Sequence, residues 1–243
     1  MNFYALIIGT EILNARREDK HFIFLRDELN KYGHELFASF IVKDDEKLIE
    51  NMFELIKKDK DAIMFSFGGI GSTPDDLTRS ISAKVFTKEK LVRHKQFEKD
   101  ILDRFEEEAY PHRIQMSDLP KDADLLKNPV NNMSGYSLFN KFFFVPGFPQ
   151  MAHPMIKEVL KTKFEAPQKK HRLTLLAQIS ENTLIHIMKD IPQNMDLSSL
   201  PIINNKNISV EISLSNTNKE ELEKYFSLFT IFLKNEKIPY NLI

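Results

Sequence analysis

Short apolar runs alternate with amphipathic stretches in the first part of the chain, and this alternation restricts the fold more than any other feature. The apolar runs have the length of buried strands and lie at 3–8, 36–42 and 62–67. The two stretches between them carry apolar residues at helical spacing. A strand–helix–strand–helix–strand order is typical of a parallel sheet with right-handed crossovers. The sequence therefore predicts an α/β fold, a doubly wound and mainly parallel sheet.

Each of the two predicted helices carries an apolar stripe that should face the sheet. The first helix, over about 19–32, ends at Gly33, a residue suited to a left-handed cap. The second begins after Asp44 and Asp45. The residues expected to face inward are Phe22, Leu25, Leu29 and Tyr32 on the first helix and Leu48, Met52, Leu55 and Ile56 on the second.

Downstream of the third strand, the sequence predicts two helices, two strands and a closing helix. The first of these helices starts with Thr73 as its N-cap and Pro74 in its first turn. The other elements are expected at 88–108, 124–127, 141–145 and about 154–162. The segment 165–170 has the composition of a linker, so the first domain is expected over 1–165.

The remaining residues, 171–243, predict a second, smaller α+β domain. Its strands are expected at 172–179 and 208–214, and its helices at 182–189 and 219–235.

Charge and composition exclude several classes of function. The chain has 34 Lys and Arg against 35 Asp and Glu, a net charge of −1. Neither nucleic acid nor a membrane surface is therefore an expected partner. The absence of cysteine rules out disulfides, thiolate metal ligands and cysteine nucleophiles. No run approaches the roughly 20 apolar residues of a membrane span, and the N-terminus lacks a signal-peptide pattern, so we expect a cytoplasmic protein.

Glycine is scarce, so each glycine marks a place where the backbone requires one. Only seven occur, and Gly68, Gly69 and Gly71 lie together directly after the third strand. A glycine-rich turn between a strand and a helix lets backbone N–H groups approach a phosphate. The turn is neither the dinucleotide fingerprint nor a P-loop, because the third glycine and the Lys-Ser/Thr pair are missing. It predicts anion binding.

Acidic residues follow the same three strands. Glu11 comes after the first strand, Asp44 and Asp45 after the second, and Asp75 and Asp76 after the glycine turn. Because the carboxyl ends of parallel strands share one edge, these carboxylates should gather beside the turn. A divalent cation held between carboxylates and phosphate would remove the repulsion between them. The alternatives stay open: helix-dipole partners at 75–76, an N-cap at 44–45 and a solvated acid at 11.

Four motifs occur in order along the first domain: Gly9-Thr10-Glu11-Ile12-Leu13, the GGIGSTPDDLT segment from Gly68 to Thr78, Asn128-Pro129-Val130 and Pro146-Gly147-Phe148-Pro149. Together they resemble the molybdopterin-binding MoaB/Mog family, and within it the CinA-like branch. The resemblance spans about 1–165 and implies a phosphorylated pterin or nucleotide as ligand and a homo-oligomer. The sequence stops before the amidohydrolase domain of full-length CinA proteins, so nicotinamide-nucleotide deamidation is not expected.

The resemblance also implies roles for single residues. It places Asp44 and Asp76 at positions for metal binding and catalysis, with Glu11 or Asp75 to orient a water molecule. The residues expected to bind the ligand are Gly68, Gly69, Gly71, Ser72, Thr73, Thr78, Asn128, Pro146 and Gly147. Ser72 departs from the family pattern, which usually has proline in this loop.

The resemblance to this family implies binding of a phosphorylated ligand and leaves three functions open. The first is a metal-dependent pyrophosphatase that cleaves a nucleotide diphosphate of the ADP-ribose type, with Mg²⁺, Mn²⁺ or Co²⁺ as cofactor. The second is a molybdenum cofactor biosynthesis protein that binds or adenylates molybdopterin. The third is a nucleotide-binding module without turnover.

Outside the motifs, His21 is expected to be an exposed helix residue.

Overall fold

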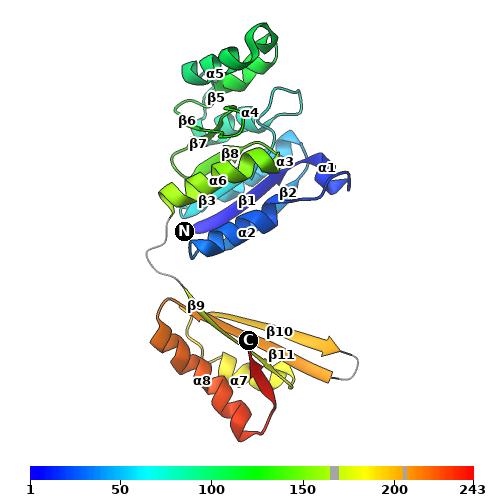
Figure 1. Cartoon of the computed structure of the whole chain (residues 1–243), viewed down its shortest axis with the longest axis vertical. Coiled ribbons are helices and arrows are strands. Elements are labelled where there is room, and N and C mark those ends of the chain that lie inside the picture. The colour runs from blue at the N-terminus through cyan, green and yellow to red at the C-terminus, as the bar shows by residue number, and fades with distance from the viewer. Residues whose placement is uncertain (165–169, 205–206) are drawn as a thin grey trace. The chain divides into compact units, whose positions relative to one another are not determined.

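The chain consists of two compact units, which the computed structural model describes over residues 1–164, 170–204 and 207–243. The units are Met1–Glu165 and Ala166–Ile243 (Figure 1). The linker expected at 165–170 lies outside the described residues except for Lys170.

The first unit is built on one six-stranded sheet. The strands are β1 (Asn2–Ile8), β2 (Leu36–Val42), β3 (Ala62–Phe67), β6 (Asp124–Leu126), β7 (Gly135–Leu138) and β8 (Phe142–Val145). Their order is β2-β1-β3-β8-β7-β6, in which β2, β1, β3 and β8 are parallel and β7 is antiparallel to both of its neighbours. The prediction of a mainly parallel α/β sheet is confirmed.

Helices cover both faces of this sheet. Helices α2 (His21–Lys31) and α6 (Pro149–Lys163) pack on one face, where Phe3, Ala5 and Ile7 point (Figure 1). Helices α3 (Glu46–Lys58) and α4 (Thr78–Ser82) pack on the other, where Tyr4, Leu6 and Ile8 point. Alternate residues of β1 therefore enter opposite cores, as expected for a strand that is buried on both faces.

Shorter elements complete the first unit. They are α1 (Thr10–Leu13), the π-helix η1 (Ala83–Thr87), α5 (Lys95–Phe105), the 3₁₀ helices η2 (Glu106–Ala109) and η3 (Arg113–Ser117), and the paired strands β4 (Val92–Arg93) and β5 (Asp118–Leu119).

The predicted inward stripe of α3 is correct in part. Ile56 is buried as expected and Met52 packs against the core, but Leu48 and Leu55 are exposed, and the helix buries Ile49 and Phe53 in their place. One residue is 100° of rotation on a helix, so the buried face is turned toward Ile49 and Phe53. On α2, Leu25 and Leu29 are buried as expected, but Phe22 is exposed.

Three predicted helix starts also differ from the structure. Thr73 is not an N-cap, because residues 73–76 form a separate turn and α4 begins at Thr78. The helix expected at 88–108 begins only at Lys95, where the His94 ring accepts a hydrogen bond from the Phe97 nitrogen. Helix α6 starts at Pro149, with Pro154 inside it.

The second unit has the β-α-β-β-α-β order of a split βαβ, or ferredoxin-like, fold. Its elements are β9 (His171–Ala177), η4 (Glu181–Leu184), α7 (Ile185–Met188), β10 (Asp196–Asn204), β11 (Asn207–Asn216), α8 (Lys219–Asn235) and β12 (Tyr240–Leu242). The sheet order is β10-β11-β9-β12, and every pair is antiparallel. The smaller α+β domain is confirmed, although the sequence did not predict β10 and β12.

The length and apolar character of the helices decide whether any of them could cross a membrane. Among the residues described, none of them combines the length and the apolar character that a membrane crossing requires.

Candidate functional site

A cavity of about 510 Å³ lies at the carboxyl ends of the parallel strands in the first unit. Its walls come from segments that follow β1, β2, β3 and β8, which a parallel sheet brings to one edge. Eleven of the residues predicted for the site line it: Glu11, Asp44, Gly68, Gly69, Gly71, Ser72, Thr73, Asp75, Asp76, Pro146 and Gly147.

Two residues predicted to bind the ligand do not line the cavity. Thr78 is fully buried, and its hydroxyl donates a hydrogen bond of 3.0 Å to the Gly68 carbonyl. Asn128 is also buried; its amide donates to the Met133 carbonyl at 3.1 Å and accepts from the Val130 nitrogen at 3.0 Å. In this structure both side chains hold loops together.

The glycine turn needs its glycines for backbone reasons. Gly68 and Gly69 have φ values of 101° and 69°, which side-chain-bearing residues rarely adopt. A Cβ on Gly68 would lie 2.3 Å from the Ile8 carbonyl oxygen, and one on Gly69 would lie 2.3 Å from the Thr78 hydroxyl. The turn therefore packs directly against the end of β1 and the start of α4.

Asp44 is fixed by the segment that follows β1. Its Oδ2 atom accepts hydrogen bonds from the backbone nitrogen and from the hydroxyl of Thr10, each 2.8 Å long. The Asp44 backbone nitrogen donates in turn to the Thr10 hydroxyl at 3.2 Å. These bonds join the ends of β1 and β2, which are 34 residues apart at this contact.

Asp76 is held in a similar way inside the glycine loop. Its Oδ2 atom accepts from the Thr73 nitrogen at 2.7 Å and from the Thr73 hydroxyl at 2.6 Å. A Cβ on Gly71 would lie 2.5 Å from the same oxygen, so the carboxylate lies directly against the loop backbone. Asp44 and Asp76 thus face one shared cavity, each with one oxygen fixed by a threonine.

The structure does not contain a ready-made metal cage. Among residues 1–164, 170–204 and 207–243, no three His, Cys, Asp or Glu side chains lie where they could hold one ion together. Mg²⁺ in phosphate-handling sites is commonly bound by one or two carboxylates together with phosphate oxygens. The donor set of Asp44 and Asp76 fits a cation that is shared with a ligand.

Part of the cavity lining is apolar. Side chains from α5, η3, α6 and the loop before β7 form it: Phe97, Phe105, Met116, Met133 and Met151. Aromatic and methionine side chains give a surface that can adapt to a flat heterocycle. The cavity therefore combines an apolar wall with a polar glycine loop.

Two arginines in the lining were not predicted from the sequence. Arg17 lies 3.6 Å from Glu11 and over the ring of Phe148. Arg113 pairs with Glu108 at 2.6 Å and stacks 4.5 Å from the centre of the Phe105 ring. Both cations are available to a polyanionic ligand. Arg17 follows the first motif by only four residues, which is the one sequence signal that could have revealed it.

A family described as a probable molybdopterin binding domain matches residues 4–166. The chain belongs to this family. The resemblance inferred from the four motifs is thereby confirmed.

Two relatives show what this molybdopterin-binding family member is similar to over most of its length. A CinA-like protein of Fusobacterium nucleatum subsp. nucleatum is 27% identical over 224 residues, which are 90% of this chain and 55% of that protein. A putative competence-damage inducible protein of Clostridium perfringens is 27% identical over 241 residues, 93% of this chain and 57% of that protein. The chain therefore spans a little over half the length of these relatives.

A solved structure supports the same assignment. The protein CinA, of unknown function, from Thermoplasma acidophilum has a TM-score of 0.60 at 26% sequence identity. The match covers 66% of this chain and 98% of that one.

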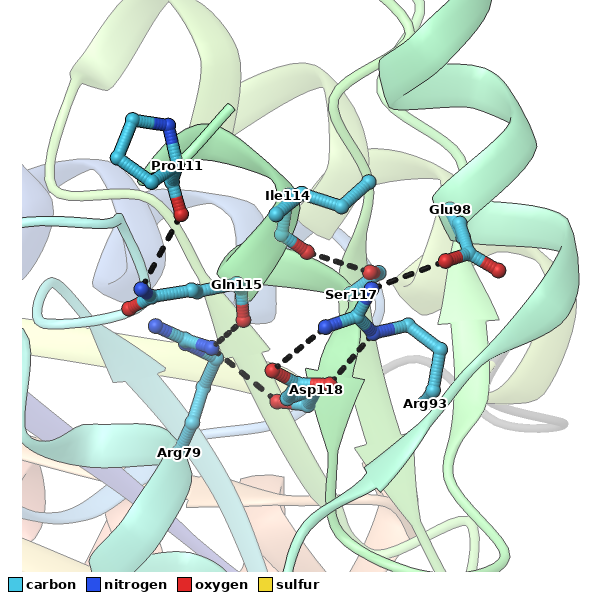
Figure 2. A network of polar contacts seen from close by, with 8 residues as sticks. All are labelled: Arg79, Arg93, Glu98, Pro111, Ile114, Gln115, Ser117 and Asp118. Carbon is cyan, nitrogen blue, oxygen red and sulfur yellow. Dashed lines mark hydrogen bonds and ion pairs between the residues drawn. The ribbon is translucent and has the colours of Figure 1, made fainter. Parts of the chain in front are cut away.

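In this member of the molybdopterin-binding family, a buried arginine supports the glycine loop. Figure 2 shows Arg79 donating to the backbone carbonyls of Gln115 and Asp118, the latter at 3.1 Å. Its other terminal nitrogen donates to the Gly71 carbonyl at 2.6 Å. Sequence reasoning missed Arg79, because its partners lie 36 and 39 residues further along the chain.

A buried histidine supports the loop after β8. His21 is 3% exposed, so the expectation of an exposed helix residue is wrong. Its Nε2 lies 3.3 Å from the Gly147 carbonyl oxygen and must be the donor, because a carbonyl only accepts. Burial lowers the pKa of His21, and the contact with Gly147 partly offsets this. The imidazole thereby fixes one residue of the cavity lining.

Proposed function

We propose that the cavity binds a phosphorylated pterin or nucleotide, and that a divalent metal ion bound with it supports hydrolysis of a diphosphate of the ADP-ribose type. One observation carries this proposal. A glycine loop, two threonine-fixed carboxylates and an apolar wall line the same cavity. A nucleotide diphosphate needs all three surfaces: one for phosphate, one for its counterion and one for its base.

The binding step uses groups of fixed position. The backbone of Gly68, Gly69 and Gly71 offers N–H groups to phosphate oxygens without interference from a side chain. Arg17 and Arg113 add positive charge at the cavity wall. The ring of the ligand packs on Phe97, Phe105 and the neighbouring methionines.

Asp44 and Asp76 are the residues that would hold Mg²⁺, Mn²⁺ or Co²⁺. A bound divalent ion neutralises developing phosphate charge and makes a bound water more acidic. Threonine hydrogen bonds fix one oxygen of each carboxylate, so neither side chain has to be ordered when a ligand arrives.

Either Glu11 or Asp75 would orient the attacking water, since both line the cavity. In the reaction, the water oxygen bonds to one phosphorus and the bond between that phosphorus and the bridging oxygen breaks. ADP-ribose and water then give AMP and ribose 5-phosphate. The glycine-loop amides stabilise the charge left on the departing phosphate.

The test is to incubate the purified protein with ADP-ribose and each of the three metal ions, and to measure AMP release. We expect Asp76→Asn and Asp44→Asn to abolish most metal-dependent release. Asp45→Asn is the matched control, because Asp45 caps α3 outside the cavity lining and asparagine caps a helix equally well. Unchanged turnover in Asp76→Asn would show that this carboxylate does not hold the metal.

The family match supports a second candidate function, the binding or adenylation of molybdopterin. In that case ADP-ribose is not cleaved, and a pterin raises the melting temperature of the protein. Binding of a nucleotide with neither cleavage nor adenylation would instead indicate a module without turnover.

We also propose that the chain forms a homo-oligomer through the edge strand β2. Apolar side chains that are exposed there and on the adjacent α3 support this, with Phe37 62% and Leu55 49% exposed. Light scattering on the wild type and on Phe37→Ser tests it. A monomeric wild type would contradict the proposal.

A further inference from the structure

Arg79 is a buried cation that contacts two segments of the cavity lining. It is 8% exposed and lies in α4, directly after the glycine loop. One terminal nitrogen of its guanidinium binds the carbonyl of Gly71, a residue of the cavity lining. The other binds the carbonyl of Gln115, which lies in the chain between the lining residues Arg113 and Met116. A single planar group thus joins the glycine loop to the segment 113–118.

No carboxylate forms a direct ion pair with Arg79 among the residues that the structure describes, although the Asp76 and Asp118 carboxylates lie near enough to interact with its charge. Its acceptors there are three backbone carbonyls, those of Gly71, Gln115 and Asp118. The Asp118 carboxylate is bound instead by Arg93, at 2.6 and 3.2 Å (Figure 2). An arginine keeps its charge in proteins, and a buried charge acts over a longer range than an exposed one.

The Gly71 contact has an electrostatic consequence for the loop. A carbonyl oxygen carries partial negative charge and would oppose a phosphate bound against the same backbone. Hydrogen bonding to the guanidinium at 2.6 Å occupies this oxygen and offsets its charge. The N–H groups of the loop can then bind phosphate with less repulsion from the Gly71 carbonyl oxygen.

We propose that Arg79 is a positioning residue that fixes the glycine loop to the segment 113–118 and makes the cavity selective for anionic ligands. This inference rests on the proposed function for its ligand, but not for the positioning role. Two properties of Arg79 can be tested separately. Its planar guanidinium tethers the glycine loop to the segment 113–118, and its positive charge favours phosphate binding.

Two substitutions separate these properties. Arg79→Lys keeps the charge but cannot reach three carbonyls with a planar fork. Arg79→Gln removes the charge as well. Arg93→Gln is the matched control, since Arg93 belongs to the same network but does not line the cavity. In the described part of the chain, its side chain binds the carboxylates of Asp118 and Glu98.

The experiment compares binding of AMP, ADP-ribose and the uncharged adenosine by calorimetry. Amide hydrogen exchange of 68–76 and 113–118 is measured on the same samples. Loss of hydrogen bonds to a charged group predicts AMP affinity roughly 10-fold weaker in Arg79→Lys and roughly 100-fold weaker in Arg79→Gln. Adenosine affinity should fall by roughly the same factor as AMP affinity in the lysine variant, and by much less than AMP affinity in the glutamine variant. A merely structural role would weaken both ligands alike in both variants.

Faster exchange of both segments in the two Arg79 variants, but not in Arg93→Gln, supports the tether. Wild-type exchange together with wild-type AMP affinity in a folded Arg79→Gln would overturn the inference. If Arg79→Gln does not fold, Arg79→Lys decides the matter by the same two measurements. If the wild-type protein binds none of the three ligands, the proposed function fails, and the exchange rates alone decide the positioning role.

Discussion

The Oδ2 atom of Asp44 accepts two hydrogen bonds from Thr10, one from its backbone nitrogen and one from its hydroxyl. The pair of Asp76 and Thr73 repeats this arrangement within the glycine loop. In both pairs a threonine from the segment that follows a strand orients a carboxylate toward the cavity. The orientation of the two carboxylates is therefore built into the folded chain before any ligand binds.

Removing the Thr10 hydroxyl should weaken the metal-dependent reaction. Thr10→Val keeps the side-chain size and the backbone hydrogen bond to Asp44 but removes the hydroxyl donor, so one hydrogen bond holds the Asp44 carboxylate where two did. Loss of a partner that orients a metal ligand typically costs 10- to 100-fold, so we expect AMP release to fall by about that factor. Thr10→Ser restores the hydroxyl and should retain most of the activity. Equal AMP release by Thr10→Val and Thr10→Ser would show that the Thr10 hydroxyl is not needed for the reaction.

Two glycines of the same loop should respond differently to alanine. Gly68→Ala forces a side chain into a φ of 101° and places its Cβ 2.3 Å from the backbone oxygen of Ile8, so the free energy of unfolding should fall by about 2–4 kcal/mol. For Gly71→Ala, the three atoms nearest the added Cβ all belong to the Asp76 carboxylate, which can rotate away. Urea unfolding should therefore show a small change for Gly71→Ala, while its AMP release is strongly reduced. Equal stability losses would contradict this.

The strand pattern predicted the sheet and the edge where the site lies, because the position of each strand along the chain depends on a local apolar run. The rotation of α3 could not be read in this way. Its sequence carries two apolar stripes one residue apart, and contacts with the sheet select the one with Ile49 and Phe53. A rule about neighbouring residues cannot make that choice.

The candidate site, like the fold, could be predicted only in part from the sequence. Residues that directly follow strands, such as Asp44 and Gly68, could be placed at the cavity from sheet topology alone. Arg79 and Arg113 could not, because their positions depend on the folded path of 106–119 and on contacts between distant segments. Helix α6 was predicted too short because Pro154 suggests a helix start, whereas the structure holds it in the second turn after Pro149.

The contact between His21 and His153 should make stability depend on pH. The His153 ring stacks on Phe24 at 3.6 Å and lies 5.3 Å from the His21 ring. Partial burial, with the nearby charges of His21 and Lys157, lowers the pKa of His153 to about 4. Its pKa in the unfolded chain is about 6.5, so between these values the unfolded state binds more protons and stability falls as the pH falls.

Melting temperatures at pH 8 and pH 5 test this prediction. His153→Phe keeps the stacking but cannot be protonated, so its melting temperature should fall less between the two values than that of the wild type. His171→Gln, at an exposed histidine, should behave like the wild type. A wild-type pH dependence in His153→Phe would assign the effect to other groups.

Asn128 should prove to be a residue of the fold and not of the ligand site. It is 1% exposed, and its amide bridges Met133 and Val130 across the loop before β7. Asn128→Ala leaves a buried carbonyl and a backbone nitrogen without their partner, which should lower the free energy of unfolding by about 1–3 kcal/mol. Asn128→Asp should cost more, because a buried carboxylate would then face the Met133 carbonyl. Met133 lines the cavity, so AMP affinity should fall in proportion to the loss of loop order in each variant. A large loss of affinity at unchanged stability would instead show that Asn128 contacts the ligand directly.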